Sequence, residues 1–129
     1  MSDIGVFRTT IEIENHLQRG IKYALKDALV DTGAEATWIP RAVLEALGIA
    51  REKTFGFRTA DGRLIHRDIG YAIVHAGGTQ TSDEVVFAEP GDMVILGARS
   101  MEGLNLRVDP RNKQLVWAGP IDAAASVAA

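Results

Sequence analysis

The chain has 129 residues, of which 47% are hydrophobic and 24% charged, and its formal net charge is −3. These values are typical of one globular domain with a sizeable core, and they exclude a chain that is disordered over most of its length. The absence of cysteine excludes disulfides, thiolate metal sites and cysteine nucleophiles, and it fits a reducing compartment, so we expect a cytoplasmic protein.

The N-terminal stretch MSDIGVFRTTIEIEN combines acidic residues with short apolar runs, which is typical of neither a signal peptide nor a membrane anchor. The chain also has no basic run of the kind that binds phosphate backbones, so we expect no nucleic-acid and no membrane partner. Residues 6–14, VFRTTIEIE, alternate in polarity and predict a half-buried strand.

A second strand and a helix are predicted next. Residues 21–30, IKYALKDALV, form an apolar pattern that ends at Asp31. The segment 39–48 predicts a helix, because Pro40 suits the first helical turn and Gly48 suits a C-terminal stop.

The middle of the chain predicts short strands joined by turns. Asp61-Gly62 lies between strand-like flanks and indicates a hairpin. Residues 69–75 and 83–88 predict two strands joined across Gly77-Gly78, and 93–97, MVILG, predicts a fully buried strand.

The C-terminal part predicts a short helix over 98–102 and two strands, 104–108 and 114–118. The tail from Pro120 on is small and nearly featureless, so we expect it to fray. The sequence therefore predicts one mainly β domain with two short helices, a sandwich or barrel over 1–119, and a flexible tail over 120–129.

The stretch ALVDTGA, residues 28–34, has two interpretations. Asp31, Thr32 and Gly33 could be an ordinary turn at the end of a strand, since all three residue types favour turns. They could also belong to an active site. The stretch ALVDTGAEATWIP, the hairpin near Asp61-Gly62 and the VILG run before a helix together resemble the retropepsin-like aspartic proteases, over roughly residues 6–118.

This resemblance implies a closed, barrel-like acid protease fold in which each chain supplies half of an active site. Two identical chains would complete it as a homodimer, with Asp31 as the catalytic residue of each. Two carboxylates so close share one proton, and they can activate a water for hydrolysis of a polypeptide substrate without a cofactor or metal.

The resemblance also implies roles for the neighbours of Asp31. Thr32 would hydrogen-bond across the dimer axis, and Gly33 would let its backbone approach the carboxylate. Ala34 lacks the hydroxyl by which a serine could favour the charged carboxylate, so we expect activity to extend nearer to neutral pH.

The hairpin at residues 57–68 matches the position of the family's substrate-covering flap, although its tip, Thr59 to Arg63, is polar where retroviral flaps are rich in glycine and apolar residues. In those relatives an arginine directly follows the glycine of the VILG run, whereas Ala98 intervenes here, which leaves the pairing of Arg99 with Glu35 open. The substrate-binding residues implied by the resemblance are Glu35, Thr59, Ala60, Asp61, Gly62 and Ile95, and the structural residues near the site are Leu96, Gly97 and Arg99.

Other residues have simpler interpretations. His16, His66 and His75 lack metal-ligand spacing. Asp27 lies about 13 Å along a strand from Asp31, too far to share a proton, and suggests exposed strand-end polarity. Trp38 and Trp117 are predicted to be core or dimer-interface anchors rather than substrate platforms, and residues 114–118 are the candidate interface strand.

Two alternatives to a peptidase stay open. The same fold could serve as a non-catalytic peptide-binding or dimerisation module that holds an extended peptide by strand addition. A small β-barrel without protease ancestry would place Asp31 outside any cleft.

Overall fold

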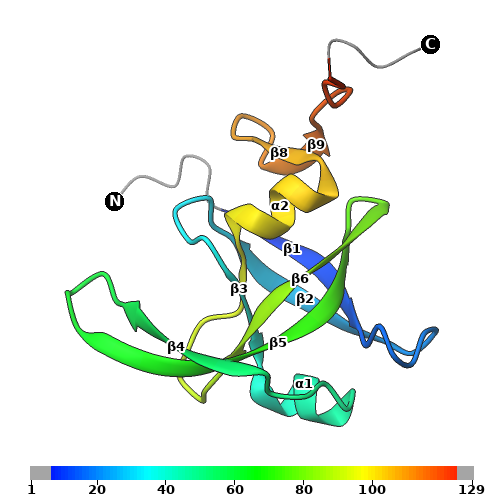
Figure 1. Cartoon of the computed structure of the whole chain (residues 1–129). Helices are drawn as coiled ribbons and strands as arrows, with labels where there is room; N and C mark the ends of the chain where they lie inside the picture. Colours follow the sequence, from blue (N-terminus) through cyan, green and yellow to red (C-terminus); the bar gives the residue numbers. More distant parts are fainter. Residues whose placement is uncertain (1–6, 125–129) are drawn as a thin grey trace.

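The computed structural model describes residues 7–124, and its main feature is a sheet that closes on itself (Figure 1). The sheet has seven strands in the order β1-β2-β7-β3-β6-β5-β4, and an additional β1–β5 pairing closes the ring. A separate two-stranded sheet pairs β8 with β9. The elements are β1 (Phe7–Glu14), β2 (Lys22–Val30), β3 (Thr37–Pro40), α1 (Arg41–Ala46), β4 (Lys53–Arg58), β5 (Leu64–Ala76), β6 (Thr79–Ala88), β7 (Ile95–Leu96), α2 (Ala98–Leu104), β8 (Leu106–Asp109) and β9 (Gln114–Trp117).

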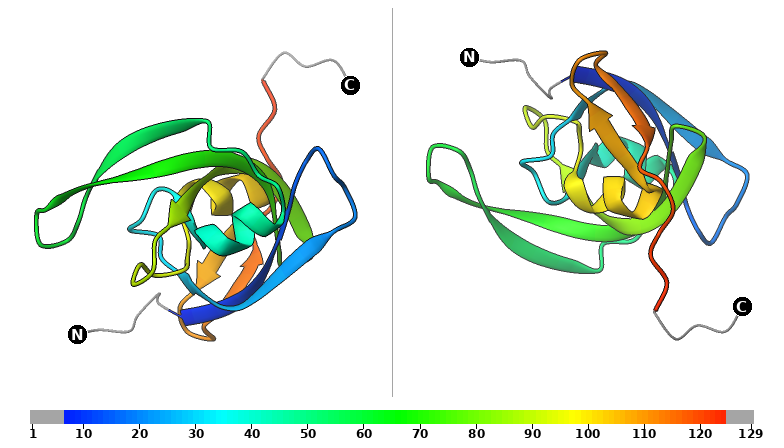
Figure 2. Two further views of the ribbon diagram at one scale, coloured as in Figure 1. Left: turned by 90° about the horizontal axis from the view of Figure 1, so that it is seen from below. Right: turned by 90° about the horizontal axis from the view of Figure 1, so that it is seen from above.

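The long strand β5 serves both the ring and a projecting hairpin. Its first half, from Leu64 to Ile69, pairs with β4, and its second half, from Ile69 to Ala76, pairs with β6. Three residues near its end, Ile73 to His75, also pair with β1. The β4–β5 hairpin therefore extends out of the ring while remaining continuous with it, as Figures 1 and 2 show.

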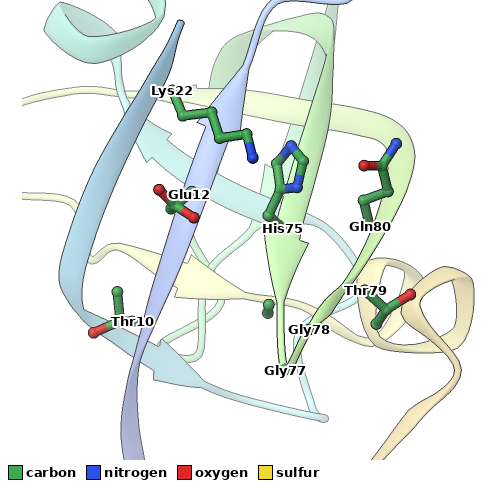
Figure 3. Close-up of a pocket in the computed structure, with 9 residues that line it drawn as sticks. Thr10, Glu12, Lys22, His75, Gly77, Gly78, Thr79 and Gln80 are labelled. Carbon is green, nitrogen blue, oxygen red and sulfur yellow. The ribbon is translucent and has the colours of Figure 1, made fainter. Parts of the chain in front are cut away.

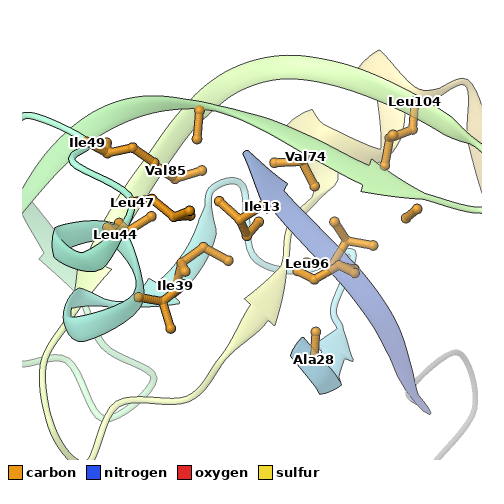
Figure 4. Close-up of a cluster of buried hydrophobic side chains, with 14 of the residues drawn as sticks. Ile13, Ala28, Ile39, Leu44, Leu47, Ile49, Val74, Val85, Leu96 and Leu104 are labelled. Atoms are coloured by element: carbon orange, nitrogen blue, oxygen red, sulfur yellow. The ribbon is translucent and has the colours of Figure 1, made fainter. Parts of the chain in front are cut away.

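The two helices cover the two ends of the ring (Figure 2). From α1, Val43 and Leu44 are buried, and from α2, Met101 and Leu104 are buried. These side chains join one apolar cluster that fills the ring (Figure 4). Members that are fully inaccessible to solvent include Ile11, Ile13, Val30, Ile39, Val74, Val85 and Leu96.

Several sequence-based boundaries are wrong, for local reasons. Pro40 ends β3 and caps α1 instead of lying in its first turn, and the helix ends at Ala46. The predicted buried strand over 93–97 shortens to Ile95–Leu96, and Met93 is exposed because it borders the cleft described below. Asp27 is exposed as predicted, but it lies within β2 and not at a strand end.

Other expectations are confirmed with longer elements. The predicted strand over 69–75 grows to 13 residues because its first half forms the hairpin with β4. The predicted helix at 98–102 extends to Leu104 and ends at Asn105, whose backbone is left-handed. Residues 120–124 of the predicted flexible tail form no regular element. Residues 125–129 of that tail, and Val6 at the start of the first predicted strand, lie outside the described residues. None of the helices within residues 7–124 has the length and apolar character needed to span a bilayer.

Candidate active site

Asp31 lies where a strand of the ring ends and the chain turns outward. Its N–H donates to the carbonyl of Leu96 over 3.1 Å, which continues the parallel pairing of β2 with β7. The preceding residue, Val30, is fully buried, whereas Asp31 is half-buried and Thr32 and Gly33 are exposed. The core thus fixes the backbone of Asp31 and leaves its loop at the surface.

Gly33 holds the Asp31 carboxylate. Its N–H donates to Oδ1 over 2.9 Å, and a Cβ at this position would lie 3.2 Å from the same oxygen. A side chain at residue 33 would therefore crowd the carboxylate, which agrees with the close backbone approach expected from the sequence. Within the described chain, this N–H is the one hydrogen-bond partner of the Asp31 side chain.

Gly97 packs directly behind the loop that follows Asp31. A Cβ at Gly97 would lie 2.3 Å from the carbonyl oxygen of Ala36, so only glycine fits here. Just after it, the first turn of α2 donates to the same loop, with Ala98 N 2.8 Å from the carbonyl of Ala34 and Arg99 N 3.1 Å from that of Glu35. Amides that begin a helix lack partners within it, and here the loop supplies them.

The Arg99 side chain does reach Glu35, the pairing that the shifted arginine left open. Its Nη2 lies 3.3 Å from Glu35 Oε2, and its Nη1 lies 3.3 Å from Glu84 Oε1. The Arg99 and Glu35 side chains are 52% and 82% exposed, so solvent screens this pair.

A cleft of about 840 Å³ opens between the Asp31 loop and the β4–β5 hairpin. Among the residues predicted from the sequence, it is lined by Asp31, Gly33, Ala34, Glu35, Thr59, Ala60, Ile95 and Arg99. Thr32, Asp61 and Gly62 lie outside its lining, and Leu96 belongs to the core.

The charges in the cleft single out Asp31. Glu84 pairs with Arg99 and with Lys53. Asp92 accepts two hydrogen bonds from Arg67, at 2.7 and 2.9 Å, and these lower the pKa of Asp92. With Glu35 paired to Arg99, Asp31 is the carboxylate of the cleft lining that no cation within residues 7–124 neutralises.

The polar side chains at the hairpin tip form hydrogen bonds with one another. Asp61 accepts one hydrogen bond from the Thr59 hydroxyl and another from Arg63 Nε at 3.0 Å. The Thr59 bond, with the Arg63 N–H bond and the Arg63 charge, lowers the pKa of Asp61. Of the polar tip residues, Thr59 and Arg63 line the cleft, whereas the Asp61 carboxylate binds within the turn.

Aromatic residues that the sequence does not predict as site residues also line the cleft. Trp38 is half-buried and lines the cleft, so it is not a core residue. Its ring meets that of Phe57 at a centroid distance of 5.0 Å and an interplanar angle of 63°. Trp38 is also the cross-strand partner of Ile95, and on β3 its two neighbours point into the core. This alternation along β3 is the signal that would place Trp38 at the surface of the ring, but the sequence does not predict a strand over Thr37–Pro40. Trp117 is 63% exposed and is not a core residue either.

A second cavity, of about 610 Å³, lies away from the Asp31 loop, between β1 and the β5–β6 hairpin (Figure 3). Its lining includes Glu12, Lys22 and His75 and none of the predicted site residues. His75 Nε2 lies 2.7 Å from the buried carboxylate of Glu14, which gives this histidine a structural partner. Within residues 7–124, no cluster of histidine and carboxylate side chains could hold a metal ion.

Comparison with known proteins gives one family match and a similar solved structure. Residues 23–102 match the family described as "gag-polyprotein putative aspartyl protease". Among solved structures, the chain is similar to the solution structure of the simian foamy virus (mac) protease, with 26% identity, a TM-score of 0.48, and coverage of 73% of this chain and 92% of that one. No curated protein matches the chain. The family match confirms the resemblance inferred from the sequence.

Proposed function

Because the chain belongs to the gag-polyprotein putative aspartyl protease family, we propose that it is an aspartic endopeptidase in which two Asp31 carboxylates, one from each copy of a homodimer, activate a water. One observation carries this proposal. The Asp31 carboxylate lies in a cleft of about 840 Å³ without a cation to neutralise it, held by a single N–H donor.

Peptide hydrolysis at such a site needs one group that takes a proton from water and another that protonates the carbonyl oxygen. Two carboxylates sharing one proton serve both needs, because the ionised partner is the base and the protonated partner is the acid. The water oxygen bonds to the carbonyl carbon, and the peptide C–N bond then breaks with the proton passing to the leaving nitrogen.

The second carboxylate is proposed to come from another copy of the chain. The other cleft carboxylates, Glu35, Glu84 and Asp92, are each paired with a cation, so none of them resembles a dyad partner. Thr32 and Gly33, next to Asp31, are exposed in the single chain. A two-fold axis beside this loop would bring two Asp31 side chains together and would let Thr32 hydrogen-bond across it.

The cleft walls suggest how a polypeptide is held. Ile95 offers an apolar wall beside Asp31, and Thr59 and Ala60 reach the cleft from the hairpin. An extended peptide between the loop and the hairpin would be shielded from bulk water when the hairpin closes over it.

The terminal strand β9 is the proposed second part of the dimer interface. Within it, Trp117 is 63% exposed, and near it Ile121 is 78% exposed. Large apolar side chains left in solvent at the edge of a two-stranded sheet are suited to burial against a second copy.

The test is cleavage of a diverse peptide mixture at about pH 4 to pH 7, with the products identified by mass spectrometry. Wild type is compared with Asp31→Asn, which keeps the shape but cannot share the proton. Asp27→Asn is the matched control, since Asp27 is an exposed carboxylate on β2, the strand that ends just before Asp31, and lies outside the cleft lining.

The proposal expects internal cleavage by wild type and Asp27→Asn and none by Asp31→Asn. Specific activity should also fall on dilution below the dimer dissociation constant, because each chain holds half of the dyad. A folded dimer that binds peptides without cutting them would favour the binding module, and concentration-independent activity in a proven monomer would refute the shared dyad.

A further inference from the structure

A chain of hydrogen bonds runs through the protein interior from the surface of β6 to the residue behind the Asp31 loop. The Ser100 hydroxyl lies 2.8 Å from Asp83 Oδ2, and the Ser100 and Thr37 hydroxyl oxygens are 2.6 Å apart. Gly97 N lies 3.0 Å from Thr37 Oγ1. Thr37 and Ser100 are fully buried, so water does not compete for these bonds.

The direction of every bond in this chain follows from chemistry. The Gly97 N–H can only donate, so the Thr37 oxygen accepts from it. The Ser100 hydroxyl donates its proton to the Asp83 carboxylate, so the Thr37 proton points at the Ser100 oxygen. The other carboxylate oxygen, Oδ1, accepts from the N–H of Glu84 over 2.7 Å, which fixes the orientation of the Asp83 side chain.

The inner end of the chain lies at the joint between α2 and the active-site loop. Gly97 has no room for a Cβ against the carbonyl of Ala36, so its position sets how close α2 approaches the loop. The next two amides, of Ala98 and Arg99, bind the carbonyls of Ala34 and Glu35. Any rotation of the Gly97 peptide would therefore move the donors that hold the residues immediately after Asp31.

We propose that Asp83, Ser100 and Thr37 form a positioning relay, which holds the Gly97 peptide and through it the loop that carries Asp31. Asp83 is the outer member, because it accepts the Ser100 proton and so fixes the orientation of both buried hydroxyls, with the Thr37 oxygen turned to Gly97. Buried polar side chains that merely filled space would be replaceable by apolar groups of the same shape at little cost. The relay instead predicts that a substitution at Asp83 changes the amide protection of Gly97 and of the two residues after it.

The test does not depend on activity, although the catalytic meaning of the relay rests on the function proposed above. Amide hydrogen exchange is measured by NMR on wild type, Asp83→Ala, Thr37→Val and Thr37→Ser. The valine keeps the shape of threonine and removes the hydroxyl, and the serine keeps the hydroxyl. Val74→Ala, a fully buried position of β5 outside the relay, controls for general destabilisation.

In Asp83→Ala and Thr37→Val, exchange at Gly97, Ala98 and Arg99 should accelerate at least about tenfold relative to the amides of β1, as loss of a buried hydrogen bond would give. Thr37→Ser and Val74→Ala should leave that ratio at its wild-type value. With a cleavable peptide, the first two variants should lower kcat by a larger factor than they raise KM, because the loop carries the reacting carboxylate.

The decisive arm is Asp83→Ala, since Asp83 is three hydrogen bonds away from Gly97 and is partly exposed, so this variant has the least effect on the core. Protection at Ala98 and Arg99 that stays at the wild-type ratio in this variant would overturn the relay. If wild type cleaves no peptide, the proposed function fails, and the exchange ratios still decide whether the relay exists.

Discussion

Trp38 and Phe57 pack edge to face, with their ring centroids 5.0 Å apart, and they join the ring strand β3 to the projecting strand β4. Both residues line the cleft that holds Asp31. Such an aromatic pair contributes about 0.5–1.5 kcal/mol beyond the apolar area that it buries. The contact therefore helps to hold the hairpin over the cleft.

Removing this contact should loosen the hairpin. For Phe57→Ala we expect KM for a peptide substrate to rise about threefold to tenfold, and amide exchange in β4 to accelerate. Phe55→Ala is the matched control, because Phe55 lines the same cleft and packs beneath Lys53 with no stacking partner in Trp38. Equal effects of the two substitutions would show that the Trp38 contact has no special role.

The periodic and turn-forming parts of this fold could be predicted from the sequence. The alternation over residues 6–14 predicts β1, and Asp61-Gly62 predicts the hairpin turn, where Gly62 has a φ of +88°. These signals are local, so they survive in a single sequence. The family resemblance added the prediction that Asp31 is catalytic and that Gly97 packs closely behind its loop. The structure explains the close packing, because a Cβ at Gly97 would lie 2.3 Å from the Ala36 carbonyl oxygen.

What could not be predicted depends on contacts between distant residues. Thr37 and Ser100 are 63 positions apart, and each alone reads as an ordinary small polar residue. Trp38 was assigned to the core or an interface because β3 has only four residues, too few to show an alternating pattern. β5 begins earlier than predicted because residues 64–68 pair with β4 outside the ring. The sequence of residues 64–68 alone does not indicate this pairing.

Gly97→Ala should be much more destabilising than Gly78→Ala. The new methyl at residue 97 would overlap the Ala36 carbonyl, and since both groups are backbone-fixed we expect a loss of at least about 3 kcal/mol of unfolding free energy. Gly78 has a φ of +80° and open space around it, so the same change there should cost about 1–2 kcal/mol from backbone strain alone. Denaturant unfolding of both variants measures the difference, and equal losses would contradict the steric argument.

The Arg99 pairs should add little to stability despite their place beside the Asp31 loop. The Arg99 and Glu35 side chains are 52% and 82% exposed, and pairs of this kind contribute at most about 1 kcal/mol. We expect Arg99→Ala to lower the unfolding free energy by less than about 1 kcal/mol, and we expect the loss to shrink as salt is added. A larger loss that salt does not change would assign Arg99 a packing role through its alkyl stem.

Glu14 should make the fold sensitive to acid. The Gly20 N–H donates to Glu14 Oε2 over 2.6 Å, and this bond lowers the pKa of Glu14. Together with the hydrogen bonds from His75 and Arg19, it brings that pKa from 4.5 to about 2. A carboxyl whose pKa is lower in the folded state stabilises it fully above its unfolded pKa, and this stabilisation is lost as the pH falls from about 4.5 towards 2.

Replacing Glu14 should remove this dependence. We expect Glu14→Gln to be less stable than wild type at neutral pH and to show a flatter loss of stability below about pH 4.5, measured by urea unfolding at a series of pH values. Glu12→Gln is the control, since Glu12 lies two residues away on the same strand, lines the open cavity of Figure 3 and forms no ion pair within the described residues. Parallel pH profiles for wild type and Glu14→Gln would exclude Glu14 as the acid-sensitive group.

Ala34 should set the acidic side of the pH profile of peptide cleavage. Its backbone N–H donates to the Asp31 carbonyl over 3.2 Å, and its side chain faces the cleft without a hydroxyl. In Ala34→Ser, the new hydroxyl could donate to the Asp31 carboxylate and stabilise its charged form, so kcat/KM should hold to lower pH and decline sooner towards neutrality. Ala36→Ser is the matched control, because Ala36 also lines the cleft but lies two residues further along the loop. A profile shifted equally by both substitutions would trace the change to general polarity in the cleft, whereas a shift confined to Ala34→Ser would show that residue 34 tunes the shared proton of the proposed dyad.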